Sequence, residues 1–316
     1  MNDYKIVKRL LLVFIIIVLF FSCTTFNRRN PYPNMEIAYY ANSQAYVFPN
    51  EASDKLIIVI DGSGWESVLG EKKGNTWKTV GLAAIFLQEL NHRYAILVLE
   101  KLKRQPGIVY FEDIEDRANY TAENLVACYT ESINNYLTAH VFSSIVLIGS
   151  SEGAALLPLV YERMDNKENV TAMVSMAFGG LSWYESNKIL SVRSDIPQGW
   201  SEMYFGASYI FRPENKAEDN EFMNSFEEDY FGFTFRYFTS FFHIRPFDYY
   251  KNIDIPVLFV HGKNDYNVPV ESTMYVQEHL PDKPFEYKYY EWEHGPGSRA
   301  DTLQFRKDIA EWILSL

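Results

Sequence analysis

The residues best suited to do chemistry are clustered in the sequence GSSEG at positions 149–153. This sequence follows an apolar run and precedes a stretch with helical spacing. A serine on a tight strand-to-helix turn presents its hydroxyl as a nucleophile, and glycines two positions before and after it relieve the crowding that a Cβ would cause. Ser151 has both of these glycines, and the rival Ser150 does not. The pattern therefore predicts Ser151 as the nucleophile of an acyl-transfer reaction.

Two further polar residues follow in the chain, each after a predicted strand. Asp265 lies in the sequence HGKNDYNVP at positions 261–269, and His294 directly precedes the last predicted helix. A histidine can activate a serine hydroxyl as a general base, and a carboxylate orients the imidazole and stabilises its charged form. We therefore predict a triad of Ser151, His294 and Asp265. His279, near the end of a predicted helix, is the rival base.

These three segments, in the order Ser, Asp, His, resemble the α/β-hydrolase superfamily. GSSEG matches its G-x-S-x-G nucleophile elbow, and HGKNDYNVP is similar to the H-G-x-x-D-x-x-V-P stretch that supplies its acid. The resemblance covers the chain from about Gln44 to Leu316. It implies a serine hydrolase with an α/β fold: a mostly parallel central sheet flanked by helices, with an inserted, mainly helical cap. It does not specify the substrate.

An acyl-transfer site also needs two N–H groups that face the developing oxyanion. The resemblance places them at Glu152, which follows the nucleophile, and at Ser63, in the loop DGSGW at positions 61–65. Asp61 puts a carboxylate where the superfamily usually has a neutral or cationic residue. Because a carboxylate needs a partner or solvent, we expect one beside Asp61. The alternative is that this loop is an ordinary glycine turn after a strand.

The elements that must position these residues alternate along the chain. Short runs rich in β-branched residues alternate with stretches of helical spacing, which is typical of βαβ units around a parallel sheet. The predicted strands are Leu56–Ile60, Tyr94–Leu99, Ser144–Ile148, Val170–Met176, Pro256–Val260 and Phe285–Glu291. The predicted helices are Val80–Leu90, Thr121–Ala139, Glu152–Glu162, Val270–Leu280 and Arg299–Ile313.

Residues 181–250 interrupt this alternation and hold 20 of the 52 aromatic side chains of the chain. An unstructured connection of this length is improbable, so we predict an inserted cap. Rings such as those at positions 231–235, 237–238 and 241–242 are expected to form an apolar wall that favours acyl or aryl groups. Ordinary core packing of a helical insertion is the alternative.

The N-terminus has the pattern of an export signal. Three basic residues precede 12 apolar residues, Leu10 to Phe21, which as a helix would span roughly 18 Å, too short for a bilayer. Ser22-Cys23 resembles the lipobox of bacterial lipoproteins, which implies a lipid on Cys23 that anchors the exported protein to a membrane of the cell envelope. A tether over 23–35 and the hydrolase domain over 36–316 would follow. An uncleaved signal anchor over Lys5–Phe21 is the alternative.

Composition excludes several other classes of protein. The net charge of −12 opposes binding to nucleic acid, and two cysteines cannot make a disulfide framework or a multi-cysteine metal site. No metal-ligand spacing is present, and a Ser-His-Asp triad needs no cofactor. We expect a serine hydrolase acting on small-molecule esters. A peptidase, thioesterase or acyltransferase with the same triad, lyase or peroxidase chemistry on this scaffold, and a non-catalytic binding lipoprotein are the alternatives.

Overall fold

The computed structural model describes residues 31–32, 34–40, 44–64, 66–73, 76–102, 106–107, 119–215, 225, 229–230 and 233–316. The predicted export signal, Cys23 and the first part of the predicted tether lie outside these residues. Within the described ranges, no helix has the length and apolar character that crossing a bilayer requires.

Strands and helices alternate along the described chain. The strands are β1 Glu36–Tyr39, β2 Gln44–Phe48, β3 Lys55–Ile60, β4 Lys72–Lys73, β5 Thr76–Trp77, β6 Ala95–Leu99, β7 Ser144–Ser150, β8 Val170–Met176, β9 Asp229–Tyr230, β10 Phe233–Thr234, β11 Val257–Gly262 and β12 Phe285–Tyr290. The α-helices are α2 Ala83–Leu90, α4 Ala122–Ala139, α5 Glu152–Arg163, α6 Trp183–Ser191, α7 Gln198–Ile210, α8 Phe235–Phe241, α9 Phe247–Tyr250, α10 Glu271–His279 and α11 Arg299–Ser315.

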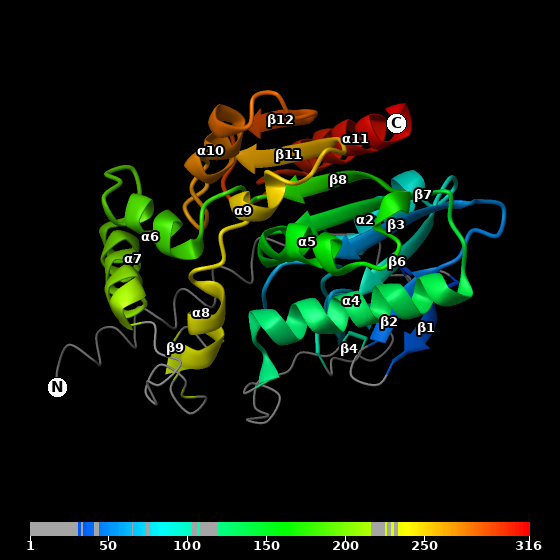
Figure 1. Ribbon diagram of the computed structural model, residues 1–316, viewed down its shortest axis with the longest axis horizontal. Helices are drawn as coiled ribbons and strands as arrows, with labels where there is room; N and C mark the ends of the chain where they lie inside the picture. The colour runs from blue at the N-terminus through cyan, green and yellow to red at the C-terminus, as the bar shows by residue number, and fades with distance from the viewer. Residues whose placement is uncertain are drawn as a thin grey trace.

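Eight strands form one sheet in the order β1-β2-β6-β3-β7-β8-β11-β12 (Figure 1). The pairs β1–β2 and β2–β6 are antiparallel, and every other pair in this sheet is parallel. The predicted mostly parallel sheet is thereby confirmed. The antiparallel hairpin of β1 and β2 was not predicted from the sequence.

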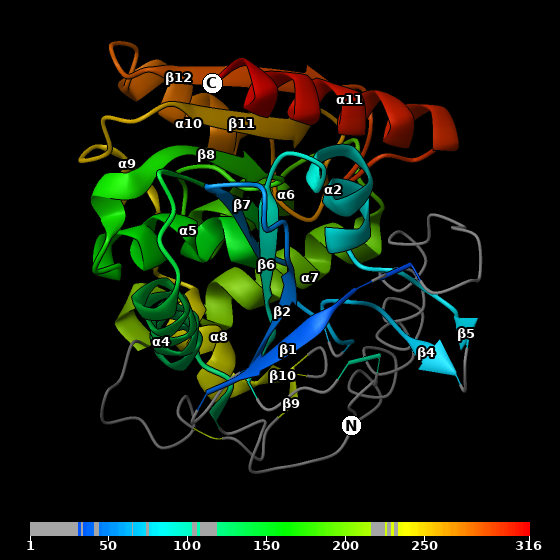
Figure 2. The ribbon, with the colours of Figure 1, turned by 90° about the vertical axis from the view of Figure 1, so that its right-hand side faces the viewer.

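Helices cover both faces of this sheet, with α4 and α5 on one face and α2 and α11 on the other (Figure 2). The buried strand β3 shows why its sequence is apolar throughout. Leu56, Ile58 and Ile60 point into the core beneath α4 and α5, whereas Ile57 and Val59 point into the core beneath α2 and α11. Because successive side chains of a strand point to opposite faces, a strand covered on both sides must be apolar at every position.

The carboxyl ends of the parallel strands meet at one edge of the sheet, where residues from distant parts of the chain come together. Strands β6 and β7 lie on opposite sides of β3, so the order of the strands reverses there. Such a reversal leaves a crevice outside the carboxyl ends of the strands, where ligands bind in open α/β sheets. In Figure 1 the arrowheads of β8, β11 and β12 point toward this edge, on the side where α6 and α7 lie.

The predicted elements agree closely with the observed ones, and the differences have local causes. The helix predicted from Val80 begins at Ala83, because Gly81 N donates to Leu69 O and holds the preceding residues in a turn. The helix predicted from Thr121 begins one residue later, since the Thr121 side chain caps it by accepting from Asn124 N.

Tyr32 shows that part of the segment predicted as a tether is packed on the body of the protein. Its side chain is 2% exposed and lies 4.8 Å from the Trp77 ring, centroid to centroid. The Tyr32 hydroxyl donates to Leu69 O at 2.5 Å and accepts from Gly81 N at 3.1 Å. The tether prediction is therefore wrong for Tyr32. The sequence did not indicate that Tyr32 is buried, because its neighbours are prolines and polar residues, which are typical of a tether.

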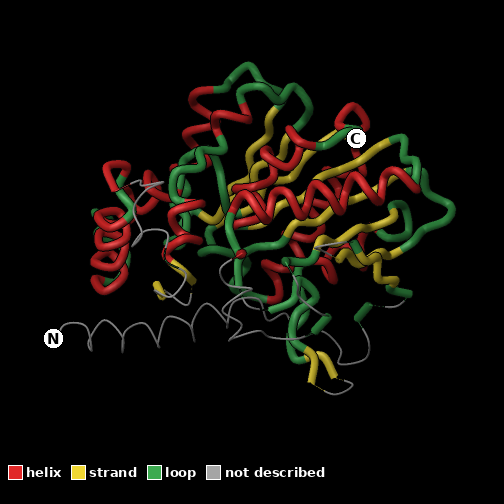
Figure 3. Tube along the Cα trace, turned by 60° about the horizontal axis from the view of Figure 1, so that its bottom comes forward, coloured by secondary structure: helices red, strands yellow, loops and turns green. Residues whose placement is uncertain are grey.

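The segment between β8 and β11, which contains the whole predicted cap, includes α6, α7, α8 and α9 (Figure 3). The rings of α8 are buried in the core shared with α4 and α5, with Phe238 8% exposed and Phe241 2% exposed. Phe211, which follows α7, packs against Phe238 at 5.2 Å between ring centroids. This packing is what the core-filling alternative predicts for these rings. Phe231, the first ring of the expected wall, lies outside the described residues.

Candidate active site

Ser151 occupies a strained turn between β7 and α5. Its φ of 51° and ψ of −116° put it in a region that residues with a Cβ rarely adopt. A Cβ at Gly149 would lie 2.7 Å from Gly153 O, and a Cβ at Gly153 would lie 2.2 Å from Ile60 O. Both glycines are therefore needed for close backbone approach, as the sequence pattern predicted.

The structure brings the three predicted catalytic side chains together in one hydrogen-bonded chain. His294 Nε2 lies 3.0 Å from Ser151 Oγ, and His294 Nδ1 lies 2.7 Å from Asp265 Oδ2. Both distances are within the range for a nucleophile, its base and the group that orients the base. His294 is 143 positions from Ser151 and 29 positions from Asp265 in the sequence, yet the three residues meet at the carboxyl edge of the sheet.

Asp265 is held rigidly in the loop after β11. Its Oδ1 accepts hydrogen bonds from Asn267 N at 2.8 Å and Val268 N at 3.0 Å, which directs Oδ2 toward His294. The His261 ring, 1% exposed, lies beside it with Nε2 3.4 Å from Oδ2. Burial raises the pKa of Asp265, but the neighbouring His294 and His261 rings outweigh it and hold that pKa well below its ordinary value. The carboxylate is therefore ionised at neutral pH.

His294 lies in the loop between β12 and α11, and main-chain hydrogen bonds attach this loop to the acid loop. Lys263 N donates to Tyr290 O at 2.8 Å, and Asn264 N donates to Trp292 O at 3.0 Å. Burial lowers the pKa of His294, but the charge of Asp265 and its hydrogen bond raise the pKa above the ordinary histidine value. The carboxylate thus stabilises the charged imidazole that general-base catalysis creates.

His279, the rival base, does not take part in this chain. It is the last residue of α10, its ring stacks on Tyr275 at 3.9 Å between centroids, and its Nδ1 lies 2.9 Å from Tyr275 O. Ser150, the rival nucleophile, is the last residue of β7.

The loop after β3 lies alongside the nucleophile because β3 and β7 are neighbours, with Ile60 paired to Gly149. A Cβ built on Gly62 would lie 3.1 Å from Ser151 Cβ. Gly62 N donates to Asp61 Oδ1 at 2.7 Å, so this N–H is already engaged. Ser63, the next residue and the predicted oxyanion donor, is exposed.

Asp61 has the partner that its burial requires. Burial raises the pKa of Asp61, and the ammonium of Lys101 acts in the opposite direction. The Lys101 side chain also donates from Nζ to Gly64 O at 3.1 Å, and this hydrogen bond holds the residue after Ser63. Sequence analysis did not identify Lys101. A signal existed, because Glu100 and Lys101 are charged residues directly after a buried strand, at the edge where such sites assemble.

Glu152, the other predicted oxyanion donor, begins α5, where main-chain N–H groups have no partner within the helix. Its side chain is 1% exposed and points away from solvent. Tyr120 donates to Glu152 Oε1 at 3.0 Å, and Tyr237 of α8 donates to Oε2. The sequence contained no signal for these two tyrosines, since each comes from a segment that is remote from the elbow.

Three further contacts join the inserted segment to the acid loop. Arg193, after α6, donates from Nη1 to Asp265 O at 3.3 Å. Tyr204 of α7 donates to Tyr266 O, and Trp200 lies edge-on to the Tyr266 ring at 5.1 Å. These contacts place the α6–α7 pair against the residue that follows the catalytic acid.

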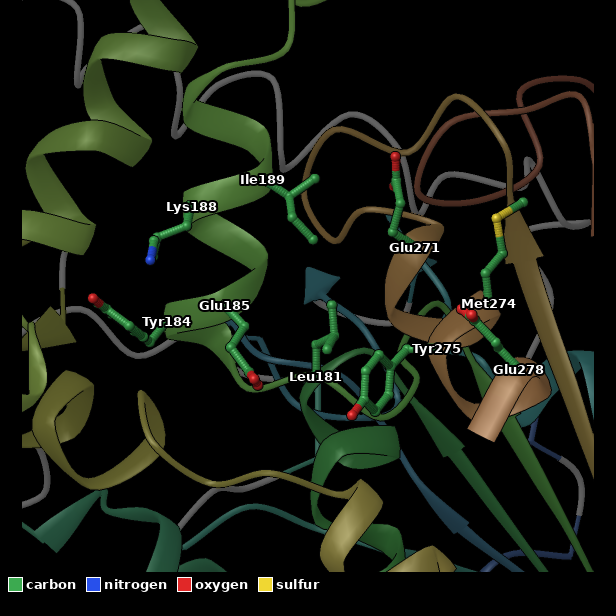
Figure 4. Close-up of a pocket in the computed structure, with 9 residues that line it drawn as sticks. All are labelled: Leu181, Tyr184, Glu185, Lys188, Ile189, Glu271, Met274, Tyr275 and Glu278. Carbon is green, nitrogen blue, oxygen red and sulfur yellow. The ribbon is translucent and has the colours of Figure 1, made fainter. Parts of the chain in front are cut away.

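A surface groove of about 560 Å³ lies between α6 and α10 (Figure 4). Leu181, Ile189 and Met274 are among the apolar residues that line it, and Glu271 is among the acidic ones. None of the three triad residues lines this groove, so it is separate from the candidate active site. Among the described residues, no group of three or more histidine, cysteine, aspartate or glutamate side chains is arranged to hold a metal ion.

The sequence matches no protein-family model and no curated protein. Solved structures with a similar fold include Est1E from Butyrivibrio proteoclasticus, with 16% identity, a TM-score of 0.55, and coverage of 89% of this chain and 98% of that one. A lipase-esterase related protein from Clostridium acetobutylicum is 20% identical, with a TM-score of 0.54 and coverage of 87% and 99%.

The acylaminoacyl peptidase from Pyrococcus horikoshii is also similar, with 14% identity and a TM-score of 0.54. The match covers 88% of this chain but 41% of the peptidase, so this chain corresponds to about two fifths of that protein. Together with the sheet order and the helices on both faces, these similarities show that the chain has the α/β-hydrolase fold.

Proposed function

We propose that this protein is a serine hydrolase that cleaves carboxylic esters through Ser151, His294 and Asp265. One observation carries the proposal: the unbroken hydrogen-bonded chain from Ser151 Oγ through His294 to the buried Asp265 carboxylate, at 3.0 and 2.7 Å. A binding protein has no need of a strained, glycine-flanked serine beside a histidine and a buried carboxylate. Such perturbed titratable groups cluster at catalytic sites.

In the proposed mechanism, Ser151 Oγ attacks the ester carbonyl while His294 Nε2 takes its proton. The resulting imidazolium is stabilised by Asp265, whose own pKa is too low for it to accept that proton. His294 then returns the proton to the leaving alcohol, and an acyl-enzyme remains. Water, deprotonated by His294, attacks the acyl-enzyme, and His294 returns this proton to Ser151 Oγ as the carboxylic acid leaves.

The main-chain N–H groups of Ser63 and Glu152 would stabilise the oxyanion of each tetrahedral intermediate. Removal of a single oxyanion donor typically costs about 10²- to 10³-fold in kcat. Glu152 N lies at the positive end of the α5 dipole, which adds to this stabilisation. Lys101 holds the loop of Ser63 in place through its hydrogen bond to Gly64 O.

Esters are proposed ahead of other acyl substrates because a lipase-esterase related protein is among the structures with this fold. The match covers 99% of that protein, whereas it covers 41% of the acylaminoacyl peptidase. Peptide cleavage by the same triad is the second candidate, because an acylaminoacyl peptidase is among the structures with this fold.

The test of this proposal is treatment of the full-length protein, in detergent, with a fluorophosphonate probe, which reacts with a serine activated by a neighbouring base. We expect stoichiometric labelling on the peptide that contains residues 149–153. The same protein is then assayed on p-nitrophenyl esters with two to twelve acyl carbons. Medium chains should be preferred over acetate, because each buried CH₂ contributes about 0.8 kcal/mol until the pocket ends.

Heat-denatured protein serves as the control and should remain unlabelled. If folded protein also remains unlabelled, the chain is a binding protein that uses this fold. If the protein is labelled and cleaves peptides but none of the esters in the series, the peptidase candidate replaces the esterase proposal.

The raised pKa of His294 leads to a prediction for the pH dependence of catalysis. The free enzyme needs neutral His294, so kcat/KM should fall as the pH drops through the pKa of this residue, above the ~6.5 of an unperturbed histidine. Asp265→Asn removes the charge that raises this pKa and leaves the burial that lowers it. The acid limb of the remaining activity should therefore move to lower pH, measured as kcat/KM between pH 5 and pH 9. If the acid limb of kcat/KM lies at the same pH in Asp265→Asn as in the wild type, a group other than His294 controls that limb.

We further propose that the protein is exported and anchored to a membrane by a lipid on Cys23. Support comes from the sequence alone, because residues 1–30 lie outside those that the structure describes. The basic residues, the short apolar run and the Ser22-Cys23 pair have the order found in bacterial lipoproteins.

Metabolic labelling with an alkyne fatty acid tests the anchor. The wild type and Cys128→Ala should be tagged, and Cys23→Ala should not. Cys128 is the matched control because it is the second cysteine of the chain, and it is 3% exposed within α4. Equal tagging of Cys23→Ala and the wild type would show that the lipoprotein proposal is wrong.

A further inference from the structure

The Glu152 side chain is a buried carboxyl group that the proposed mechanism does not use. Its residue directly follows the nucleophile, and it is 1% exposed. Each carboxyl oxygen accepts a hydrogen bond from a different phenol: Oε1 from Tyr120 at 3.0 Å, and Oε2 from Tyr237. Burial of a polar group of this kind requires such partners.

The two phenols are themselves fixed in place. Tyr120 is 3% exposed and Tyr237 is 1% exposed, and their ring centroids are 5.6 Å apart. Phe233 stacks on the Tyr237 ring at 4.3 Å, and Phe241 lies 4.7 Å from it. Both hydroxyls therefore reach Glu152 from side chains whose orientation is fixed by the packing around them.

A second set of hydrogen bonds joins the start of α4 to the last turn of α8. Ser240 Oγ accepts from Ala122 N at 3.0 Å and donates to Tyr237 O at 2.7 Å. The segment that contains Tyr120 and the helix that contains Tyr237 thus form one unit around the Glu152 carboxylate. Helix α8 belongs to the segment inserted between β8 and β11, so this unit joins the insertion to the nucleophile elbow.

We propose that Tyr120 and Tyr237 are positioning residues for the oxyanion hole, and that they act by holding the Glu152 side chain so that its main-chain N–H faces the oxyanion. This inference rests on the proposed hydrolase function and assigns part of its transition-state stabilisation to the inserted segment. The N–H of the first residue of a helix has no intrahelical hydrogen bond to hold it. Its direction therefore depends on how the side chain of the same residue is held. The phenols also donate to both oxygens of a buried carboxyl group on the residue that follows Ser151.

A positioning role predicts a loss in kcat with little change in KM, because the N–H contact strengthens only in the transition state. Full-length Tyr237→Phe and Glu152→Gln should each lose about tenfold in kcat and in the rate of fluorophosphonate labelling, with KM within about twofold. Glu152→Gln keeps an oxygen acceptor for one phenol. The double variant should lose little more than the larger of the two single losses, because both changes act on the same pair of hydrogen bonds between phenol and carboxyl.

Tyr290→Phe is the matched control, since the Tyr290 hydroxyl also donates to a carboxylate, that of Asp308, at 2.5 Å between β12 and α11. It should keep the wild-type kcat even where its thermal midpoint falls. If Tyr237→Phe lowers the thermal midpoint but leaves kcat and the labelling rate unchanged, the tyrosine only stabilises the fold and the inference is wrong.

Tyr120→Phe provides a second variant should Tyr237→Phe not fold, and the same loss in kcat is expected of it. Wild-type labelling separates the two proposals. If the wild type is labelled and the Tyr237→Phe and Tyr120→Phe variants are labelled at the same rate as the wild type, the inference is wrong and the hydrolase proposal is unaffected. An unlabelled, folded wild type overturns both.

Discussion

Ser151→Ala is expected to lose at least about 10³-fold in kcat on any ester that the protein accepts, and to lose fluorophosphonate labelling completely. The reason is that His294 Nε2, 3.0 Å from the Ser151 hydroxyl, would have no nucleophile to activate. Initial rates on p-nitrophenyl esters and mass spectrometry of the labelled protein measure both effects. The thermal midpoint should stay the same or rise slightly, because alanine removes one oxygen from a half-buried turn.

Ser150→Ala is the matched control, since it removes the same atom one residue earlier, at the end of β7. This variant should keep activity within a few-fold of the wild type. If activity survives in Ser151→Ala and disappears in Ser150→Ala, the nucleophile is Ser150 and our assignment is wrong.

His294→Ala is the second change for which we expect a loss of at least about 10³-fold in kcat. Without the imidazole, neither the proton of Ser151 nor that of the attacking water has an acceptor in the hydrogen-bonded chain that ends at Asp265. Because removal of either member disables the same unit, the Ser151→Ala/His294→Ala double variant should be little worse than either single variant. Steady-state kinetics on one ester, at the optimal pH of the wild type, compares all three.

His279→Ala controls for the loss of a histidine in general. The His279 ring stacks on Tyr275 at the end of α10 and takes no part in the triad chain. Its kcat should stay close to that of the wild type. A larger loss in His279→Ala than in His294→Ala would mean that the base has been assigned to the wrong histidine.

Local patterns predicted the elements that form the centre of the fold. Strand β8 has the bounds predicted for it, Val170–Met176, and the other buried strands differ by one or two residues at their ends. Their apolar runs are unambiguous because both faces of these strands are covered. The hairpin of β1 and β2 was missed, since its strands, EIAY and QAYVF, lack the continuous run of β-branched residues that marks the other strands.

The nucleophile elbow was predictable for a steric reason that acts within five residues. Gly149 and Gly153 are required by contacts that a Cβ would make at 2.7 and 2.2 Å, and the serine between them must adopt a positive φ. The acid and the base were located by the strands that precede them, because the ends of parallel strands gather at one edge of a sheet. The order Ser, Asp, His, which resembles that of the α/β-hydrolase superfamily, then indicated which residue is the acid and which is the base.

By itself, the sequence determined the strand and helix alternation, the strained serine, and the two partners of that serine at strand ends, because these features depend on neighbours in the chain and on strand direction. Only the tertiary structure decided what surrounds them. Lys101 reaches Gly64 and influences the pKa of Asp61 because β6 lies next to β3, and Tyr237 reaches Glu152 across 85 residues because α8 packs on α4 and α5. Buried charges depend on partners supplied by whichever elements pack against them, and the order of residues along the chain does not contain that information.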